Sequence, residues 1–289
     1  MSHQNLQRVV VRMLHDVRFA ESVFESPKST LSGLELTDTE RAWIASSDAR
    51  AYRTDPHRGA RVLTAIIEEF ALTSALLARA SGSIQVLHDY ISSPEFHRAI
   101  QQRESVALAF GSYVDGGSAD EAHGGRTSRH IAQIEYAIAT LRRIRTLPPA
   151  PGGGIYQLCS TTRLLQLPSG TVDYFESLRA HLAGYPGGLV AAAIHVDFPI
   201  PKIPGALRRP SQEFEGALID LAANAVGPTI EVLPPALAAI LIGLGDGLDE
   251  AAFVAMAQSK GADNADEARA LLADLVSDGL LIRGSPCVT

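Results

Sequence analysis

The sequence predicts an α+β fold, in which an all-helical bundle precedes an α+β domain with a winged-helix-like end. Three observations support this. Apolar residues recur at three- and four-residue spacing from Asn5 to about Thr146. The run 147–154 is the densest in Pro and Gly and cannot continue a helix. Short strand-like and helical segments then alternate to the end of the chain. We expect domains over 1–146 and 155–289 with 147–154 as the linker.

The bulk composition limits the classes of partner and compartment. The 289 residues include 25 Lys and Arg against 32 Asp and Glu, a net charge of −7 that repels phosphates, so nucleic acid is not an expected partner. Cys159 and Cys287 are too isolated for a zinc site or a disulfide framework. Residues 1–20 lack a secretory signal pattern, and apolar runs such as Leu189–Ile194 are too short to span a bilayer. We expect a cytoplasmic protein without a membrane partner.

The first half reads as a series of helices. An apolar face marks the first helix, formed by Leu6, Val9, Val10, Met13, Leu14 and Val17. Thr37 and Glu40 have the spacing of a capping box, and we expect Trp43 and Ile44 on the buried side of the helix that follows. The remaining helices are expected at Pro56–Ala80, Ile84–Tyr90, Glu95–Tyr113 and Thr127–Arg145, with a loop at Asp115–Gly125.

The second half mixes strands and short helices. Ile155–Cys159 and Arg163–Leu167 are rich in aliphatic and β-forming residues and predict a hairpin or two short strands. A buried strand is expected at Leu189–Phe198, followed by a Pro-rich loop at Pro199–Pro210. Short helices are expected at Thr171–Leu182 and Phe214–Ala225.

The last part of the chain has the clearest local pattern, and we name Leu233–Gly284 the C-terminal module. A brief strand at Thr229–Leu233 leads into it. Three short helices follow, the first ended by Gly245-Asp-Gly247, and Asp278-Gly279 then turns into a closing strand. These elements are expected at Pro235–Leu244, Leu248–Ser259, Asn264–Ser277 and Leu280–Arg283. Three helices and a closing strand are typical of a winged helix.

No pattern of catalytic or metal-binding residues stands out. The nine histidines include no His-Glu-x-x-His and no pair at i, i+4 beside a carboxylate. Cys159 would need a partner such as His195 to act as a nucleophile, and a free cysteine is more often a small buried apolar residue. Gly152–Gly154 follows prolines and lacks the Lys of a phosphate loop. We therefore expect no catalytic residue, no metal ligand and no cofactor in this chain.

One cluster of basic residues has two interpretations. It is a solvated face paired with nearby acids such as Glu68 and Glu69, or a docking surface for an acidic partner or a peptide carboxylate. The residues of this basic cluster are Arg50, Tyr52, Arg53, Arg58 and Arg61.

Two sets of residues resemble known families. Leu233–Gly247 and Leu271–Ile282, an apolar helix ending in Asp-Gly and a last helix running into Gly-Leu-Leu-Ile, resemble the PqqD-like precursor-recognition element of ribosomal peptide modification systems. The rest of the chain is similar to the partner subunits of multinuclear non-haem iron peptide-modifying oxidases, of the methanobactin (MbnC) and thiaglutamate (TglI) kind. The segments that carry this similarity are Leu6–Phe19, Leu36–Arg41, Pro94–Ala99, Ser105–Tyr113, Glu135–Arg145 and Arg163–Pro168.

The resemblance implies a non-catalytic protein that binds the leader of a precursor peptide and presents it to an iron-dependent oxidase. The iron is expected in the oxidase, and this chain is expected to hold none. The leader would add as a strand to a sheet edge, with alternate side chains entering an apolar groove. By this analogy Ile230 and Val232 belong to the edge. The groove helix would contribute Leu237, Ile240, Leu241 and Leu244. For all six residues the alternative role is plain core.

Two other functions remain open from sequence. A winged-helix transcriptional regulator needs a basic recognition helix, whereas Asn264–Ser277 carries Asp266, Glu267 and Asp274 against Arg269 alone. A small helical dioxygenase-like subunit is the third possibility, suggested only by the first helices.

Overall fold

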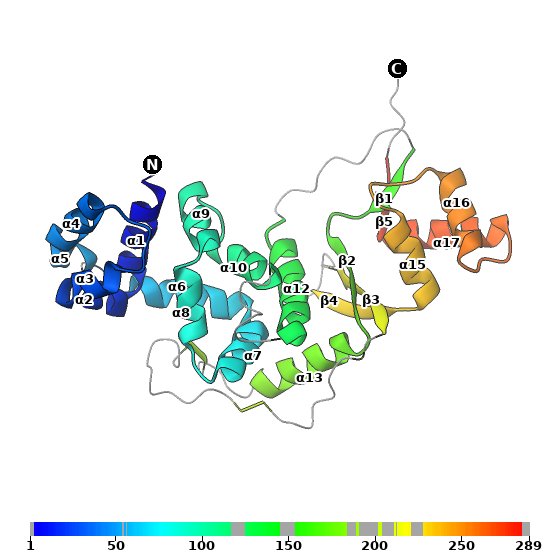
Figure 1. Cartoon of the computed structure of the whole chain (residues 1–289). Coiled ribbons are helices and arrows are strands. Elements are labelled where there is room, and N and C mark those ends of the chain that lie inside the picture. Colours follow the sequence, from blue (N-terminus) through cyan, green and yellow to red (C-terminus); the bar gives the residue numbers. More distant parts are fainter. Residues whose placement is uncertain are drawn as a thin grey trace, which may run out of the picture. The chain divides into compact units, whose positions relative to one another are not determined.

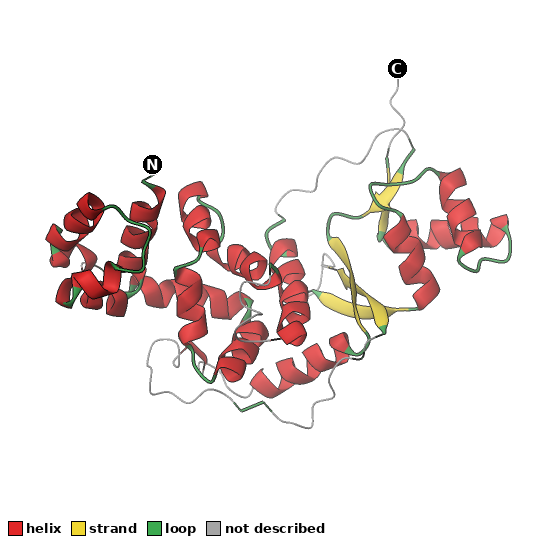
Figure 2. Ribbon diagram, viewed as in Figure 1, coloured by secondary structure: helices red, strands yellow, loops and turns green. Residues whose placement is uncertain are grey.

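The computed structural model has an α+β fold, in which helices predominate and the sheets are small and antiparallel (Figures 1 and 2). It describes residues 3–53, 55, 57–116, 125–144, 154–183, 189–190, 202–203, 211, 213–220 and 228–284. The chain forms two compact units. The first unit holds 1–135 with 178–205, and the second holds 136–177 with 206–289. This division does not follow the expected linker, of which only Gly154 lies within the described residues.

The first unit is helical, as the periodicity predicted. Helices from residues 4 to 115 are α1 (Gln4–His15), α2 (Val17–Glu25), α3 (Pro27–Leu31), α4 (Asp38–Ser46), α5 (Ala49–Arg53), α6 (Arg58–Glu69), α7 (Ala71–Ser81), α8 (Gln85–Ile91), α9 (Pro94–Gln102) and α10 (Val106–Asp115). A longer helix, α12 (Gly125–Leu141), begins in this unit and continues into the second. The expected loop at 115–125 lies mostly outside the described residues.

Several expected helices are interrupted. The first ends at His15 because Asp16 accepts a hydrogen bond from the Phe19 N–H at 2.9 Å and caps α2, which leaves Val17 exposed. The helix expected at 56–80 divides at Phe70, and the one at 95–113 divides where Arg103 adopts a left-handed conformation with φ 57°.

The start of α4 confirms one local prediction and corrects another. Thr37 and Glu40 form the expected capping box, since each side chain bonds to the backbone N–H of the other. The placement of Trp43 on the buried side was wrong. Ile44 is buried, but Trp43 is 54% exposed, because adjacent helical residues lie about 100° apart and only one of them faces the interior.

The second unit contains five described strands. They are β1 (Tyr156–Leu158), β2 (Thr162–Pro168), β3 (Phe214–Asp220), β4 (Thr229–Leu233) and β5 (Leu281–Arg283). Besides the end of α12, the described helices that lie in it wholly or in part are α13 (Thr171–Ala183), α15 (Pro235–Gly243), α16 (Glu250–Ser259) and α17 (Ala265–Ser277). The expected elements after residue 229 are confirmed, except that Leu248 precedes α16 as an isolated bridge to Tyr156.

Strands β2, β3 and β4 form one antiparallel sheet in that order. The helix expected at Phe214–Ala225 was therefore wrong, because residues 214–220 form the central strand, hydrogen-bonded on both sides. Gly216 of this strand approaches α15 so closely that a Cβ would lie 2.4 Å from the Cβ of Ala238. The strand expected at Leu189–Phe198 falls almost entirely outside the described residues.

A second, smaller sheet joins segments that are far apart in sequence. The two strands expected after the linker are present, but they do not form a hairpin with each other, because β1 pairs with β5 instead. On its other side Tyr156 exchanges two backbone hydrogen bonds with Leu248, at 2.7 and 3.0 Å. Strand β1 thus lies between two segments of the C-terminal module.

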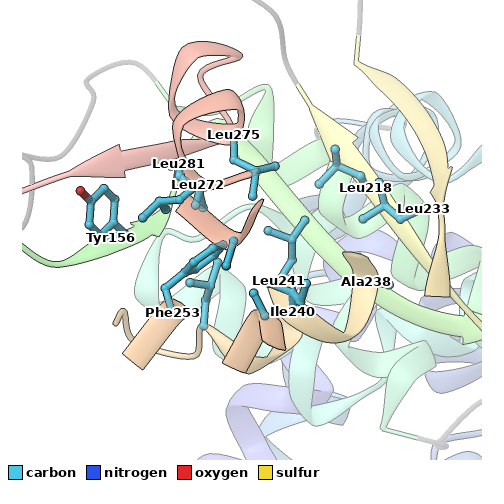
Figure 3. Close-up of a cluster of buried hydrophobic side chains, with 13 residues drawn as sticks. Tyr156, Leu218, Leu233, Ala238, Ile240, Leu241, Phe253, Leu272, Leu275 and Leu281 are labelled. Carbon is cyan, nitrogen blue, oxygen red and sulfur yellow. The ribbon is translucent and has the colours of Figure 1, made fainter. Parts of the chain in front are cut away.

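One apolar cluster holds the C-terminal module together (Figure 3). It brings both sheets into contact with the three helices, since Leu218 and Leu233 come from β3 and β4 while Leu281 comes from β5. Figure 3 shows Phe253 and Leu272 projecting into it from α16 and α17. Its buried members are Tyr156, Leu218, Leu233, Ala238, Ile240, Leu241, Leu244, Phe253, Ala257, Ala268, Leu272, Leu275 and Leu281.

Candidate functional site

Strand β4 forms an edge of the larger sheet. Among the described strands it pairs with β3 alone, in a register that places Ile230 opposite Ile219 and Val232 opposite Ala217. Ile230 and Val232 alternate with Glu231, so they share one face of the strand. Ile219 and Ala217 are fully buried, whereas Ile230 is half-buried and Val232 is 49% exposed. The apolar face of the sheet therefore continues from the buried residues of β3 to the more exposed Ile230 and Val232 on the edge strand β4.

The opposite face of the same strand is anchored to helix α15. Leu233 and its partner Gly216 face this helix, and Leu233 is buried in the apolar cluster of the module. Glu231 lies on this face two residues earlier and is exposed. A strand added beside β4 would thus meet apolar side chains on one face and a carboxylate on the other.

The other described edges are less accessible. Leu281 in β5 is only 1% exposed, which includes its backbone, so the edge of β5 is covered at this residue. Strand β2 ends in buried Leu167 and Pro168, and proline has no N–H to offer a further strand. Of the edges that the structure describes, β4 exposes the largest share of its length.

The expected groove residues on α15 lie in the interior. Ile240, Leu241 and Leu244 are buried in the cluster, and Leu237 is partly buried against it. Their surroundings match the alternative of plain core, and only Leu237 retains surface that a ligand can touch. Sequence reasoning missed Phe214, which is exposed at the start of β3.

A shallow groove of about 400 Å³ lies beside α17. Its apolar floor includes Leu272 and Val276, and its rim holds two arginines. Arg269 is held by Asp266 at 2.9 Å and Glu250 at 3.4 Å, while the guanidinium of Arg283 lies 5.5 Å from the centre of the Tyr156 ring. The lining residues are Tyr156, Glu250, Arg269, Leu272, Ala273, Val276, Ser277 and Arg283.

The structure divides the basic cluster between two helices. Tyr52 on α5 is half-buried, and its ring meets that of Phe24 at a tilt of 54° with centres 5.7 Å apart, so it belongs to the interior of the first helices. The backbone of Arg50 bonds to Asp48, and the side chain of Arg53 lies outside the described residues. At the start of α6, Arg58 and Arg61 both pair with the carboxylate of Asp55.

Both arginines of α6 thus share one acceptor, the carboxylate of Asp55. Its hydrogen bond from Arg61, together with the charges of Arg61 and Arg58, lowers the pKa of Asp55 below the usual value. Arg58 and Arg61 therefore already have an acidic partner in the chain, as expected for a solvated face whose arginines pair with nearby acids.

The described residues offer no group of three or more His, Cys, Asp or Glu side chains arranged to hold a metal ion. Cys159 is half-buried, and its sulfur lies 3.1 Å from the hydroxyl of Thr161. His195, its suggested partner, is outside the described residues.

Among the residues that the structure describes, no helix is both long enough and apolar enough to cross a membrane.

Comparison with known proteins adds no family. No family model matches the sequence, and no curated protein matches it either.

Proposed function

We propose that this chain is a non-catalytic partner that binds the leader of a ribosomally synthesised precursor peptide and presents it to an iron-dependent peptide-modifying oxidase. The observation that carries the proposal is the exposed edge of β4. An extended peptide can add to such an edge by backbone hydrogen bonds, while alternate side chains contact the apolar row of Ile230 and Val232.

The order of elements around this edge supports a winged-helix-like, PqqD-like interpretation of the C-terminal module. Helices α15, α16 and α17 follow one another with short connections, and β5 follows α17 directly. Leu248, β1 and β5 pair side by side as the small sheet of a winged helix does. In this interpretation β4 leads directly into the first helix of the module, through Pro234.

The charge of α17 disfavours the transcriptional regulator. Its single basic residue, Arg269, pairs with Glu250 through Nε and with Asp266 through Nη1. A helix that reads DNA in the major groove needs free donors and a positive surface. We therefore retain peptide rather than nucleic acid as the ligand.

Binding can be tested with two matched variants. Val232→Lys places a charge on the apolar rim of β4, whereas Ile242→Lys changes an equally apolar side chain, 45% exposed, on α15. The probe is a fluorescently labelled synthetic peptide encoded beside the nearest oxidase gene. Fluorescence anisotropy should show binding to the unaltered protein, loss of about tenfold or more with Val232→Lys, and little change with Ile242→Lys.

A second experiment tests whether the chain forms a complex with the oxidase. Co-expression with that oxidase should yield a complex that co-elutes on size exclusion, with iron in the oxidase chain. The proposal is overturned if the purified chain binds neither the peptide nor the oxidase. Salt-sensitive binding to duplex DNA instead would support the regulator.

A further inference from the structure

The first unit contains a cavity of about 610 Å³ that the proposed function does not use. Helices α1, α2, α6 and α8 and the segments beside them contribute its walls, and α1 contacts both α2 and α6 directly. The volume lies within the range of small-ligand sites, roughly 300–1,000 Å³. Basic and titratable side chains predominate among its polar lining, with Arg12, Arg18, His15, His57 and His88.

The cavity lining carries excess positive charge. Of the lining residues that the structure describes, Asp16 alone is a carboxylate. This carboxylate is already engaged twice, by the N–H of Phe19 at 2.9 Å and by the Nε of Arg12 at 3.6 Å. Since Arg12 and Arg18 contribute two positive charges against one negative charge, the cavity attracts an anion.

Two buried nitrogen atoms at the wall are without hydrogen-bond partners. These are Nδ1 of His15 and Nε of Arg12, the latter ion-paired with Asp16 at 3.6 Å but beyond hydrogen-bond distance of any described group. The guanidinium of Arg12 is held in place by the Phe19 ring, with its central carbon 3.9 Å from the ring centre. A buried polar atom without a hydrogen bond costs about 1–3 kcal/mol, so an acceptor brought within hydrogen-bond distance of His15 Nδ1 would remove a penalty.

Both burial and nearby positive charge act on His15. Burial first, and then the positive charges of Arg58 and Arg61, lower the pKa of His15 to about 4, while Asp55 opposes this. The ring also meets Phe96 edge to face at 5.1 Å, which fixes its position. His15 is therefore neutral at pH 7, and a nearby anion would raise its pKa by offsetting the charges of Arg58 and Arg61.

We propose that this cavity binds an oxyanion, the carboxylate or phosphate group of a small ligand, through Arg12 and Arg18 with the His15 ring at its wall. Arginine is suited to this role because its fork of N–H donors matches the oxygen atoms of either group. The proposal is independent of peptide binding at β4.

The test uses the full chain and simple anions. Sodium sulfate, inorganic phosphate and citrate are titrated by isothermal calorimetry against a constant background of sodium chloride. We expect saturable binding of at least one oxyanion, and a shift of the His15 ring resonances in NMR spectra on its addition. Phosphate preference would indicate a phosphorylated ligand and citrate preference a carboxylate ligand. Binding of none of them at millimolar concentration overturns the proposal.

Variants locate the site. Arg18→Gln and Arg12→Lys should weaken binding about tenfold, since each removes or shortens a charge-assisted hydrogen bond. Arg142→Gln, an exposed residue outside the cavity lining, removes the same charge and should leave affinity unchanged. Melting temperatures without ligand show whether each variant is folded, and Arg18, which is exposed, is the variant least able to disturb packing. Equal weakening by Arg18→Gln and Arg142→Gln would show nonspecific attraction and contradict the proposal.

Discussion

The buried carboxylate of Glu135 accepts a hydrogen bond from the backbone N–H of Thr73 at 3.0 Å, across 62 positions of sequence. Its second oxygen accepts from the N–H of Leu72 at 2.9 Å. Helix α7 needs this contact because Phe70, at its N-cap, has no side chain able to accept from the first turn. Burial raises the pKa of Glu135 to about 7, although the hydrogen bonds from residues 72 and 73 act in the opposite direction.

The raised pKa of Glu135 predicts a pH-dependent contribution to stability. The folded state holds this proton up to about pH 7, whereas the unfolded state releases it near 4.5, so between these values the folded state binds more protons. The contribution of Glu135 to the free energy of unfolding should therefore fall as pH rises through this window and stay constant above it. Urea titrations of the unaltered chain and of Glu135→Gln measure it as a difference. A difference that does not vary between pH 4.5 and 7 would refute the prediction.

Removal of the carboxylate should destabilise the first unit. In Glu135→Ala the N–H groups of Leu72 and Thr73 lose their acceptor inside the fold, at an expected cost of about 2–4 kcal/mol. Glu40→Ala is a useful control because it removes the capping-box carboxylate of α4, which accepts from a single backbone N–H, and it should cost less. Chemical denaturation followed by circular dichroism compares the two. Equal losses would argue against a special role for burial.

Gly247 should be intolerant of any side chain. It has φ 120°, and a Cβ there would lie 2.5 Å from Cγ2 of Ile155 and 3.1 Å from the carbonyl oxygen of Tyr156. Gly261 has the same φ of 120° but nothing within 4 Å of a Cβ, so it isolates the backbone strain. Gly261→Ala should cost about 1–3 kcal/mol. Gly247→Ala should cost about 1–3 kcal/mol more, because it also overpacks the Leu248–Tyr156 bridge. Thermal unfolding of both variants is the measurement, and equal costs would disprove the close approach.

Core and edge residues of the C-terminal module should respond differently to substitution. Leu241 is buried, so Leu241→Ala should lower the free energy of unfolding by about 2–5 kcal/mol. Val232→Lys, on an exposed edge, should change it by no more than about 0.5 kcal/mol. Urea denaturation tests both. A large loss of stability in Val232→Lys would mean that the Val232 side chain is buried, in contradiction to an exposed edge at β4.

Trp43 should report on solvent rather than on packing. It is the only tryptophan of the chain and is largely exposed, so the folded protein should show the long-wavelength emission of a solvated indole and strong quenching by iodide. Trp43→Phe should alter stability by no more than about 0.5 kcal/mol. Short-wavelength emission that resists quenching would contradict the exposed position.

Local features were readable from sequence because neighbouring residues determine them. The capping box of Thr37 and Glu40 needs only a three-residue spacing, and the helices of the C-terminal module follow from periodicity and from the Gly-Asp-Gly break. By the same logic, Ile230 and Val232 were placed on a strand. Their accessibility depends on the absence of a further described strand beside β4, which no local pattern encodes.

The errors in assigning strands arose where distant segments decide the outcome. Residues 214–220 combine Ala, Leu and Glu, which are good helix formers, but pairing with β2 and β4 makes them a strand. The partner of β1 is β5, more than a hundred residues later, rather than the adjacent β2. Glu135 likewise gave no sign in sequence that it caps a helix 62 residues earlier.

The pairing of β1 with β5 also determines how the chain responds to tension. Gly154 donates to the carbonyl of Gly284 at 3.2 Å, and Gly284 donates to Ile155 at 2.9 Å, so the incoming and outgoing chain meet at one end of the antiparallel pair. A force applied at these two points would open the strands one hydrogen bond at a time, as a zipper opens, rather than shear all of them together. The small sheet is therefore the place where the C-terminal module should give way first under load.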